Sequence, residues 1–131
     1  MSSIFTKIVN GEIPSYKVAE DDKHYAFLDI FPTAKGHTLV IPKKEVDKYF
    51  DLEEQEYIDL MRFARKVAKG IEKAIPCNRV GLSVIGLDVP HAHVHLIPIN
   101  KVSDMSFEKE KLKLSTEEFQ EIAENISKAI E

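Results

Sequence analysis

In His91-Ala92-His93-Val94-His95-Leu96-Ile97, the stretch that decides the fold, polar imidazoles alternate with apolar side chains. Such alternation is typical of a β-strand, in which successive side chains point to opposite faces. We expect a strand over residues 91–98, bounded by Pro90 and Pro98, with three imidazoles about 7 Å apart on one face. Burying them without partners would cost about 1–3 kcal/mol for each ring. This face must therefore border a polar pocket, a metal ion or water.

Short apolar runs elsewhere predict four more strands, at residues 16–19, 24–30, 36–42 and 79–85. Between the third and fourth of these, apolar residues recur at helical spacing from Ile58 to Ile75 and predict one long helix. Asp51 and Glu54 have the spacing of a capping box that would start this helix. Short strands with one inserted helix indicate an α+β fold with a mainly antiparallel sheet of about five strands.

Two shorter helices are expected near the ends of the chain. Residues 4–11 form a helical turn ending at Gly11. A second capping box, Ser115 with Glu118, starts a C-terminal helix. Its apolar stripe would consist of Phe119, Ile122, Ala123, Ile126 and Ile130. The charged, aperiodic residues 99–114 would form an exposed connection to it.

The composition predicts one globular domain over residues 1–131. The chain is 44% hydrophobic and 31% charged, with a net charge of −4 and one cysteine, Cys77. A negative charge without a basic stripe argues against nucleic acid as a partner. No run reaches the ~20 apolar residues of a membrane helix, and no signal peptide is recognisable. We therefore expect a cytoplasmic protein without a membrane partner.

Three interpretations of the clustered histidines remain open. The rings could lie on a solvated strand face or be buried with partners. A His-x-His pair could chelate zinc, although no further ligand pattern lies nearby and Cys77 stands alone. The third interpretation is nucleophilic chemistry, because imidazole with a pKa near ~6.5 is largely neutral at pH 7 and departs readily from phosphorus.

Residues 91–97 resemble the His-φ-His-φ-His-φ-φ motif (φ, hydrophobic) of the histidine-triad (HIT) superfamily. Three further segments, 4–14, 26–32 and 36–43, are similar to the opening segment, nucleotide-binding strand and third strand of that family, in the same order. The resemblance covers about residues 3–98 and is closest to the Hint-like branch of nucleoside phosphoramidate hydrolases, usually homodimers with joined sheets. It implies a HIT-like fold and a homodimer with joined sheets for this chain, with residues 99–131 as an extension.

The resemblance assigns the chemistry to four histidines. The middle histidine of the triad is the family nucleophile, which implies a nucleotidyl intermediate on His93. His95, with backbone N–H groups near Asp88 and Val89, would hold the phosphate oxygens. His91 would position the nucleophile, and His37 matches a histidine that the family keeps beside the triad. An ordinary polar residue at a strand start is the alternative for His37.

The resemblance also implies a pocket for a purine nucleotide. Asp29 matches the ribose-binding carboxylate, which can accept hydrogen bonds from both ribose hydroxyls. Phe5, Phe27 and Ile30 would sandwich the base. Core packing is the alternative for the two phenylalanines, and a turn at the strand end is the alternative for Asp29.

This sequence departs from the family pattern at two places. Ser3 and Thr6 replace a Cys-x-x-Cys pair that binds structural zinc in many bacterial relatives, so we predict no metal and no cofactor. Leu87 and Asp88 follow Gly86 where the family often has Gly-Gln-Ser, whose serine assists the leaving group. An ionised Asp88 would repel a phosphate unless it points away, binds a cationic amine or stays protonated.

The leading hypothesis is hydrolysis of a purine nucleoside phosphoramidate at its α-phosphate. A dinucleoside polyphosphate hydrolase, a nucleotide-binding regulatory module and a metal-dependent hydrolase are the alternatives. For the extension, the C-terminal helix could simply cover its own sheet. Alternatively, residues 99–114 could border the nucleotide pocket through Asp104, Met105 and Phe107.

Overall fold

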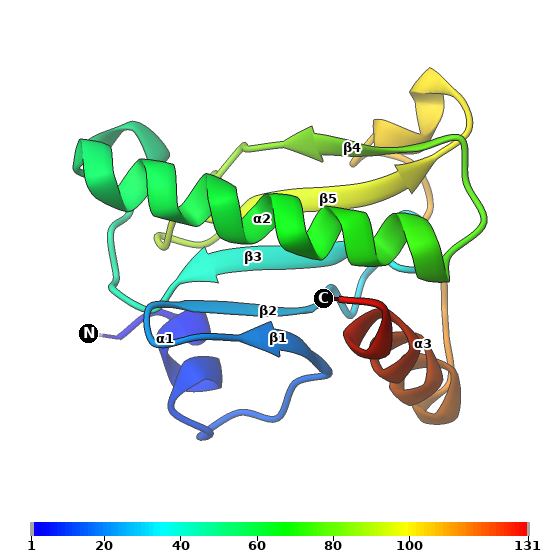
Figure 1. The fold of residues 1–131 in the computed structure, drawn as a ribbon, viewed down its shortest axis with the longest axis horizontal. Coiled ribbons are helices and arrows are strands. Elements are labelled where there is room, and N and C mark those ends of the chain that lie inside the picture. Colours follow the sequence, from blue (N-terminus) through cyan, green and yellow to red (C-terminus); the bar gives the residue numbers. More distant parts are fainter. Residues whose placement is uncertain (1, 131) are drawn as a thin grey trace.

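The computed structural model describes residues 2–130 and contains a five-stranded antiparallel sheet with three α-helices. In chain order the elements are α1 (Ile4–Val9), β1 (Lys17–Glu20), β2 (His24–Leu28), β3 (Thr38–Pro42), the 3-10 turn η1 (Tyr49–Asp51), α2 (Glu54–Ala74), β4 (Arg79–Ser83), β5 (Val94–Ile99), the 3-10 turn η2 (Val102–Met105) and α3 (Thr116–Ala129). The strand order is β1-β2-β3-β5-β4, so β5 lies between β3 and β4 (Figure 1). The predicted α+β class, long helix and C-terminal helix are confirmed.

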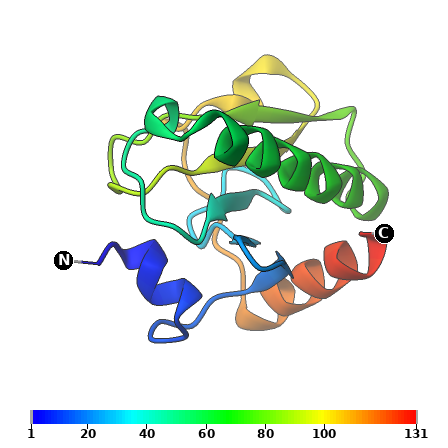
Figure 2. The same ribbon diagram turned by 60° about the vertical axis from the view of Figure 1, so that its left-hand side comes forward.

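The two faces of the sheet pack against different helices, because successive side chains of a strand point to opposite faces. Ala26, Val40 and Val94 point to the side where α2 and α3 lie, and join the main core. Phe27 and Leu39 point to the opposite side, where they pack with α1. Figures 1 and 2 show α2 running across the sheet, with α3 beside its C-terminal end. The face with α1 is therefore the one that remains for a site.

The strand of the histidine motif is shorter at its start than predicted. β5 begins at Val94, so His91, Ala92 and His93 precede it. The reason is that the backbone here bonds elsewhere: the N–H of Ala92 donates to the carbonyl of Val46 at 2.7 Å. The prediction that Pro98 ends the strand was also wrong. Pro98 lies inside β5 opposite Val80, beyond the last residue that pairs with β3, where a missing N–H breaks no β3 pair.

The long helix begins at Glu54, and its cap differs from the predicted one. Glu53 is the N-cap, and its N–H donates to the Glu56 side chain at 2.9 Å. Asp51 belongs instead to η1, so the predicted pair of Asp51 and Glu54 does not form the box. The capping box of α3 is present as predicted, since Ser115 and Glu118 exchange hydrogen bonds.

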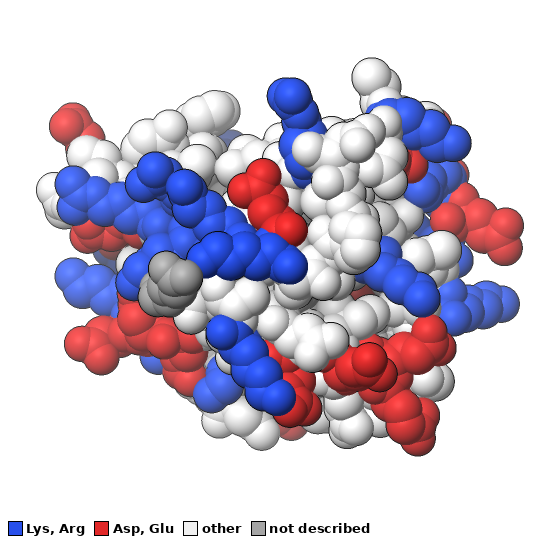
Figure 3. Space-filling view, turned by 45° about the vertical axis from the view of Figure 1, so that its right-hand side comes forward, with Lys and Arg blue, Asp and Glu red and all other residues white. Residues whose placement is uncertain are grey.

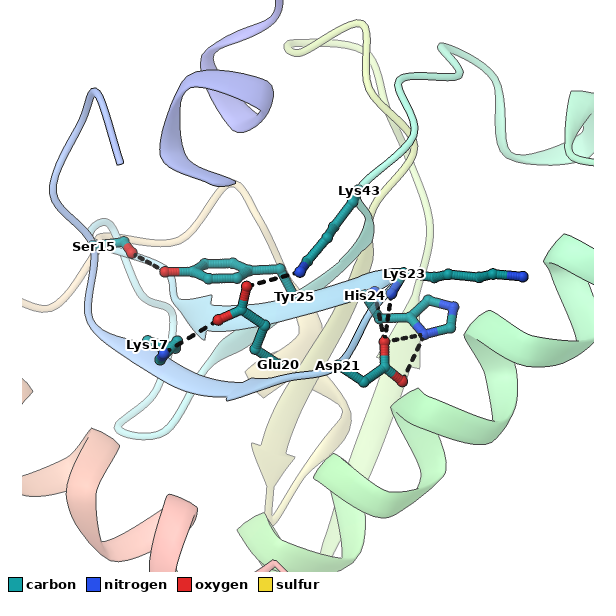
Figure 4. Close-up of polar contacts among 8 residues, drawn as sticks. All are labelled: Ser15, Lys17, Glu20, Asp21, Lys23, His24, Tyr25 and Lys43. Carbon is teal, nitrogen blue, oxygen red and sulfur yellow. Dashed lines mark hydrogen bonds and ion pairs between the residues drawn. The ribbon is translucent and has the colours of Figure 1, made fainter. Parts of the chain in front are cut away.

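Polar contacts fix the β1–β2 hairpin at the far edge of the sheet (Figure 4). Asp21 accepts hydrogen bonds from the N–H groups of Lys23 and His24 and lies 2.9 Å from the His24 ring. The buried His24 ring stacks on Phe63 of α2 at 5.1 Å. This fifth histidine therefore belongs to the packing of the hairpin against the long helix.

The C-terminal helix is part of the main core. The buried face of α3 consists of Phe119, Ile122, Ala123 and Ile126. Phe119 stacks on Tyr16 at 4.8 Å, and Ile130 lies against Gly70 of α2. Basic and acidic side chains intermingle over the side of the molecule shown in Figure 3. Within residues 2–130, no helix is long and apolar enough to cross a membrane.

Candidate active site

A pocket of about 670 Å³ lies on the face of the sheet that carries α1. A volume of this size suits a small-molecule ligand. Its walls come from α1, the end of β2, the loop before the histidine motif and the segment after η2. The pocket brings together eight predicted site residues: Phe5, Phe27, Asp29, Ile30, Asp88, Val89, His93 and His95. The remaining two, His37 and His91, lie behind this wall and are almost fully buried.

His91 is held by groups that fix its tautomer. Its Nε2 lies 2.7 Å from the carbonyl of Pro42, which can only accept, so Nε2 carries the proton. Its Nδ1 then accepts from the Ser3 hydroxyl, 2.8 Å away. Burial lowers the pKa of His91, which keeps the ring neutral. His91 is therefore a neutral, doubly hydrogen-bonded ring.

Ser3 belongs to a polar cluster at the N-terminus of α1. Its N–H donates to Oε1 of Glu45 at 2.6 Å, and the Thr6 hydroxyl donates to the same oxygen at 2.7 Å. The Ser3 N–H is the main reason that the pKa of Glu45 is lowered. The hydroxyls of Ser3 and Thr6 thus join α1 to His91 through hydrogen bonds.

His93 lines the pocket and is oriented by the backbone. Its Nδ1 lies 2.8 Å from the carbonyl of His91, so Nδ1 carries a proton and donates it. In the neutral ring the lone pair is consequently on Nε2. The edge of Phe5 packs against the ring at 5.0 Å. His93 is therefore an oriented imidazole on the pocket wall, in which Nδ1 is the ring nitrogen that bonds to the backbone.

His37 and His95 form a second oriented pair. The N–H of Thr33 donates to Nδ1 of His37 at 3.1 Å, which places the His37 proton on Nε2. That proton is donated to Nδ1 of His95 at 2.9 Å, so the His95 proton is on Nε2. Burial is the main cause that lowers the pKa of His37 to about 3 and that of His95 to about 4. Both rings are neutral at pH 7, and His95 offers an N–H to the pocket.

Asp29, His37 and His95 also have one ligand atom each within 4.8 Å of one another, the spacing of a metal site. The hydrogen bonds do not fit a metal ion there. The N–H of Thr33 occupies the lone pair on Nδ1 of His37, so the Nε2 that faces the group carries a proton. A metal ion would need a lone pair on that nitrogen. The cluster is instead arranged for hydrogen bonding.

Asp29 is a turn residue at the end of β2 that also lines the pocket. Its Oδ1 accepts from the N–H of Phe31 at 2.8 Å, as a turn residue does. Its Oδ2 lies 3.6 Å from Nε2 of His37, and the carboxylate lines the pocket. Burial raises the pKa of this carboxyl. The turn therefore holds the acid in place while one oxygen stays near the histidines.

The loop before the triad forms the open rim of the pocket. Gly86 has a φ of +74°, a conformation that favours glycine. Leu87 and Asp88 follow it and are exposed, with Leu87 at 88%. Leu87 and Asp88 thus lie at the mouth of the pocket.

The segment after β5 contributes two pocket residues, Phe107 and Lys111. The Phe107 ring lies 4.6 Å from that of His95, and Nζ of Lys111 donates to the Phe107 carbonyl at 2.6 Å. The expected role of this segment was right for Phe107. It was wrong for Asp104, which accepts from the N–H groups of residues 100 and 101, and for Met105, which lies against Gly81. Lys111 was missed.

The fold and this site define a member of the HIT domain family. The family model matches residues 10–102, and the chain belongs to this family. Adenosine 5'-monophosphoramidase hnt1 of Schizosaccharomyces pombe is 39% identical over 135 residues, covering 99% of each chain. A HIT-like protein of Borreliella burgdorferi is 36% identical over 95% of each chain. The crystal structure of a Hit-like protein from Bartonella henselae superposes with a TM-score of 0.85 at 33% identity, covering 98% of this chain and 96% of the other.

Proposed function

We propose that this chain hydrolyses a purine nucleoside phosphoramidate at the α-phosphate, through a covalent nucleotidyl intermediate on His93. The observation that carries the proposal is the hydrogen bond of 2.8 Å from Nδ1 of His93 to the His91 carbonyl. It leaves the Nε2 lone pair of the neutral ring free, on a side chain that lines the pocket. The phosphoramidase name of the fission yeast relative, at 39% identity, supports the same chemistry.

In this mechanism Nε2 of His93 attacks the α-phosphorus while the bond from phosphorus to the amine nitrogen breaks. The departing amine takes up a proton from solvent water at the open rim, and one proton returns to solvent when water hydrolyses the intermediate. His95 donates its Nε2–H to one non-bridging phosphate oxygen, and the backbone N–H groups near Asp88 and Val89 donate to the other. Water then attacks the phosphorus, releases the nucleoside monophosphate and restores the imidazole. His91 and His37 position the nucleophile and the donor without touching substrate.

The remaining lining residues supply the nucleoside subsite. Asp29 accepts hydrogen bonds from the ribose hydroxyls with the oxygen that faces the pocket. Phe5 and Phe27, with ring centroids 5.5 Å apart at an interplanar angle of 70°, give the purine an apolar wall. Ile30, which is 56% exposed, covers the base from the other side. The exposed apolar surface of Ile30 is then buried by the ligand.

Asp88 favours an amine over a nucleotide as the leaving group. Its carboxylate lies at the rim, where it attracts an ammonium group and repels the phosphates of a second nucleotide. A phosphoramidate therefore fits this pocket better than a dinucleoside polyphosphate.

The test is turnover of an AMP–amine conjugate in the presence of EDTA. The account expects wild-type protein to release AMP, and His93→Ala to lose several orders of magnitude in rate while still binding AMP. Near-normal turnover by His93→Ala would reject the covalent mechanism. Loss of wild-type activity in EDTA would favour a metal-dependent hydrolase.

We further propose that two copies associate through the edge of the sheet at β4. This strand has only one neighbour in the sheet, and unpaired strand edges favour association. Nearby apolar side chains are exposed, with Leu82 at 46% and Val102 at 90%. Light scattering at micromolar concentration should give the mass of a dimer, and a monomeric mass would contradict this assembly.

A further inference from the structure

The pocket has an unusual charge distribution for a site that binds an anion. Two carboxylates, Asp29 and Asp88, line it. His95 is neutral at pH 7, because burial lowers its pKa to about 4. Among the described residues that line the pocket, Lys111 is the one Lys or Arg. A phosphoryl group that enters this pocket therefore meets a single lysine ammonium.

Lys111 is held close to the reacting groups. Its Nζ donates to the carbonyl of Phe107 at 2.6 Å and lies 5.5 Å from the centroid of the Phe107 ring. That ring in turn contacts His95 at 4.6 Å. An ammonium group has three N–H donors, and the Phe107 carbonyl takes one of them. Lys111 lines the pocket, and its ammonium keeps N–H donors beyond the one given to the Phe107 carbonyl.

The charge of Lys111 also acts on the site's own groups. Burial is the main reason that the pKa of His37 falls to about 3, and the charges of His95 and Lys111 lower it further. Burial raises the pKa of Asp29, whereas the charge of Lys111 opposes that change. The charge of Lys111 therefore acts on groups in and beside the pocket that the lysine lines.

We propose that Lys111 binds the anionic phosphate of the substrate and is the electrostatic partner of the non-bridging oxygens on its α-phosphorus. This inference rests on the proposed function. The residue lies beyond residue 102, where the match to the family model ends. The charge that pairs with the phosphate would thus come from the C-terminal extension and not from the domain core. The ligand class is a phosphorylated nucleoside. The affinity for an uncharged nucleoside should not depend on this lysine.

The test measures the affinities of AMP and adenosine by calorimetry. Each ligand is titrated into full-length wild-type protein, Lys111→Met and Lys111→Arg. Lys111→Met should weaken AMP binding by roughly 10- to 100-fold, the usual range for a hydrogen bond to a charged group. Adenosine binding should change by less than about 2-fold, because no anion is present. Lys111→Arg should retain most of the AMP affinity. Lys113→Met, an exposed lysine outside the pocket, is the matched control and should bind both ligands normally.

Each other outcome overturns the inference. Equal losses for AMP and adenosine would mean that Lys111 only supports Phe107. Unchanged AMP affinity in Lys111→Met would mean that the phosphate lies elsewhere. If the wild-type protein bound neither ligand, the proposed function itself would fail, and the inference with it. Adenosine binding by Lys111→Met separates a local effect from a failure to fold.

Discussion

At the scale of single residues, the backbone selects the protonated nitrogen of each site histidine. Carbonyl oxygens accept from Nε2 of His91 and Nδ1 of His93, and these oxygens cannot donate. Behind His95, the N–H of Thr33 acts as the fixed donor to His37. Two rings that line the same pocket thereby take opposite tautomers, so that one offers a lone pair and the other an N–H.

The ribose assignment of Asp29 can be tested at this scale. Asp29→Asn should weaken binding of AMP more than binding of 2′-deoxy-AMP, by about 1–2 kcal/mol, because a charge-assisted hydrogen bond becomes neutral. Calorimetry with both nucleotides measures the difference. Equal losses for the two sugars would show that the carboxylate serves only the turn at Phe31.

The sequence predicts those site residues that stand in a recognisable pattern. His93, His95 and Asp29 were all predicted to line one pocket, and they do so. Lys111 could not be found in this way. It lies in a charged segment without periodicity, where several lysines look alike, and only the folded structure shows which of them lines the pocket.

At the scale of elements, the period-2 pattern shows which side chains share a face but not where the sheet begins. His91 and His93 both contact Phe5, as the shared face requires. The ladder nevertheless starts only at Val94, since the backbone of Ala92 bonds to the loop after β3. Such a tertiary bond has no local sequence signal.

We expect the segment between β5 and α3 to influence which amine leaving groups are preferred. Phe107→Ala should change the ranking of amine leaving groups several-fold, because the ring forms part of the pocket wall beside His95. Asp104→Ala and Met105→Ala are controls that lie outside the pocket lining and should keep the wild-type ranking. Rates are measured on a series of AMP–amine conjugates, with thermal melting to compare stability. An unchanged ranking in Phe107→Ala would show that this segment does not determine the preference for the leaving group.

At the scale of the whole molecule, the sheet separates the main hydrophobic core from the pocket. One face buries the main core with α2 and α3, where a side chain such as Ile71 or Ile126 is fully enclosed. The other face carries α1 and the pocket, so the reactive rings stand on a packed support. This division follows from the alternation of apolar and polar residues that the sequence shows in the histidine motif.

The central claim is that His93 becomes covalently attached to the nucleotide, and mass spectrometry tests it most directly. Wild-type protein, mixed with an AMP–amine conjugate and quenched with denaturant during turnover, should gain the mass of one adenylyl group. Peptide mapping should place that group on His93, and His93→Ala should show none. Full turnover with no adduct trapped at any quench time, or an adduct on another residue, would contradict the account.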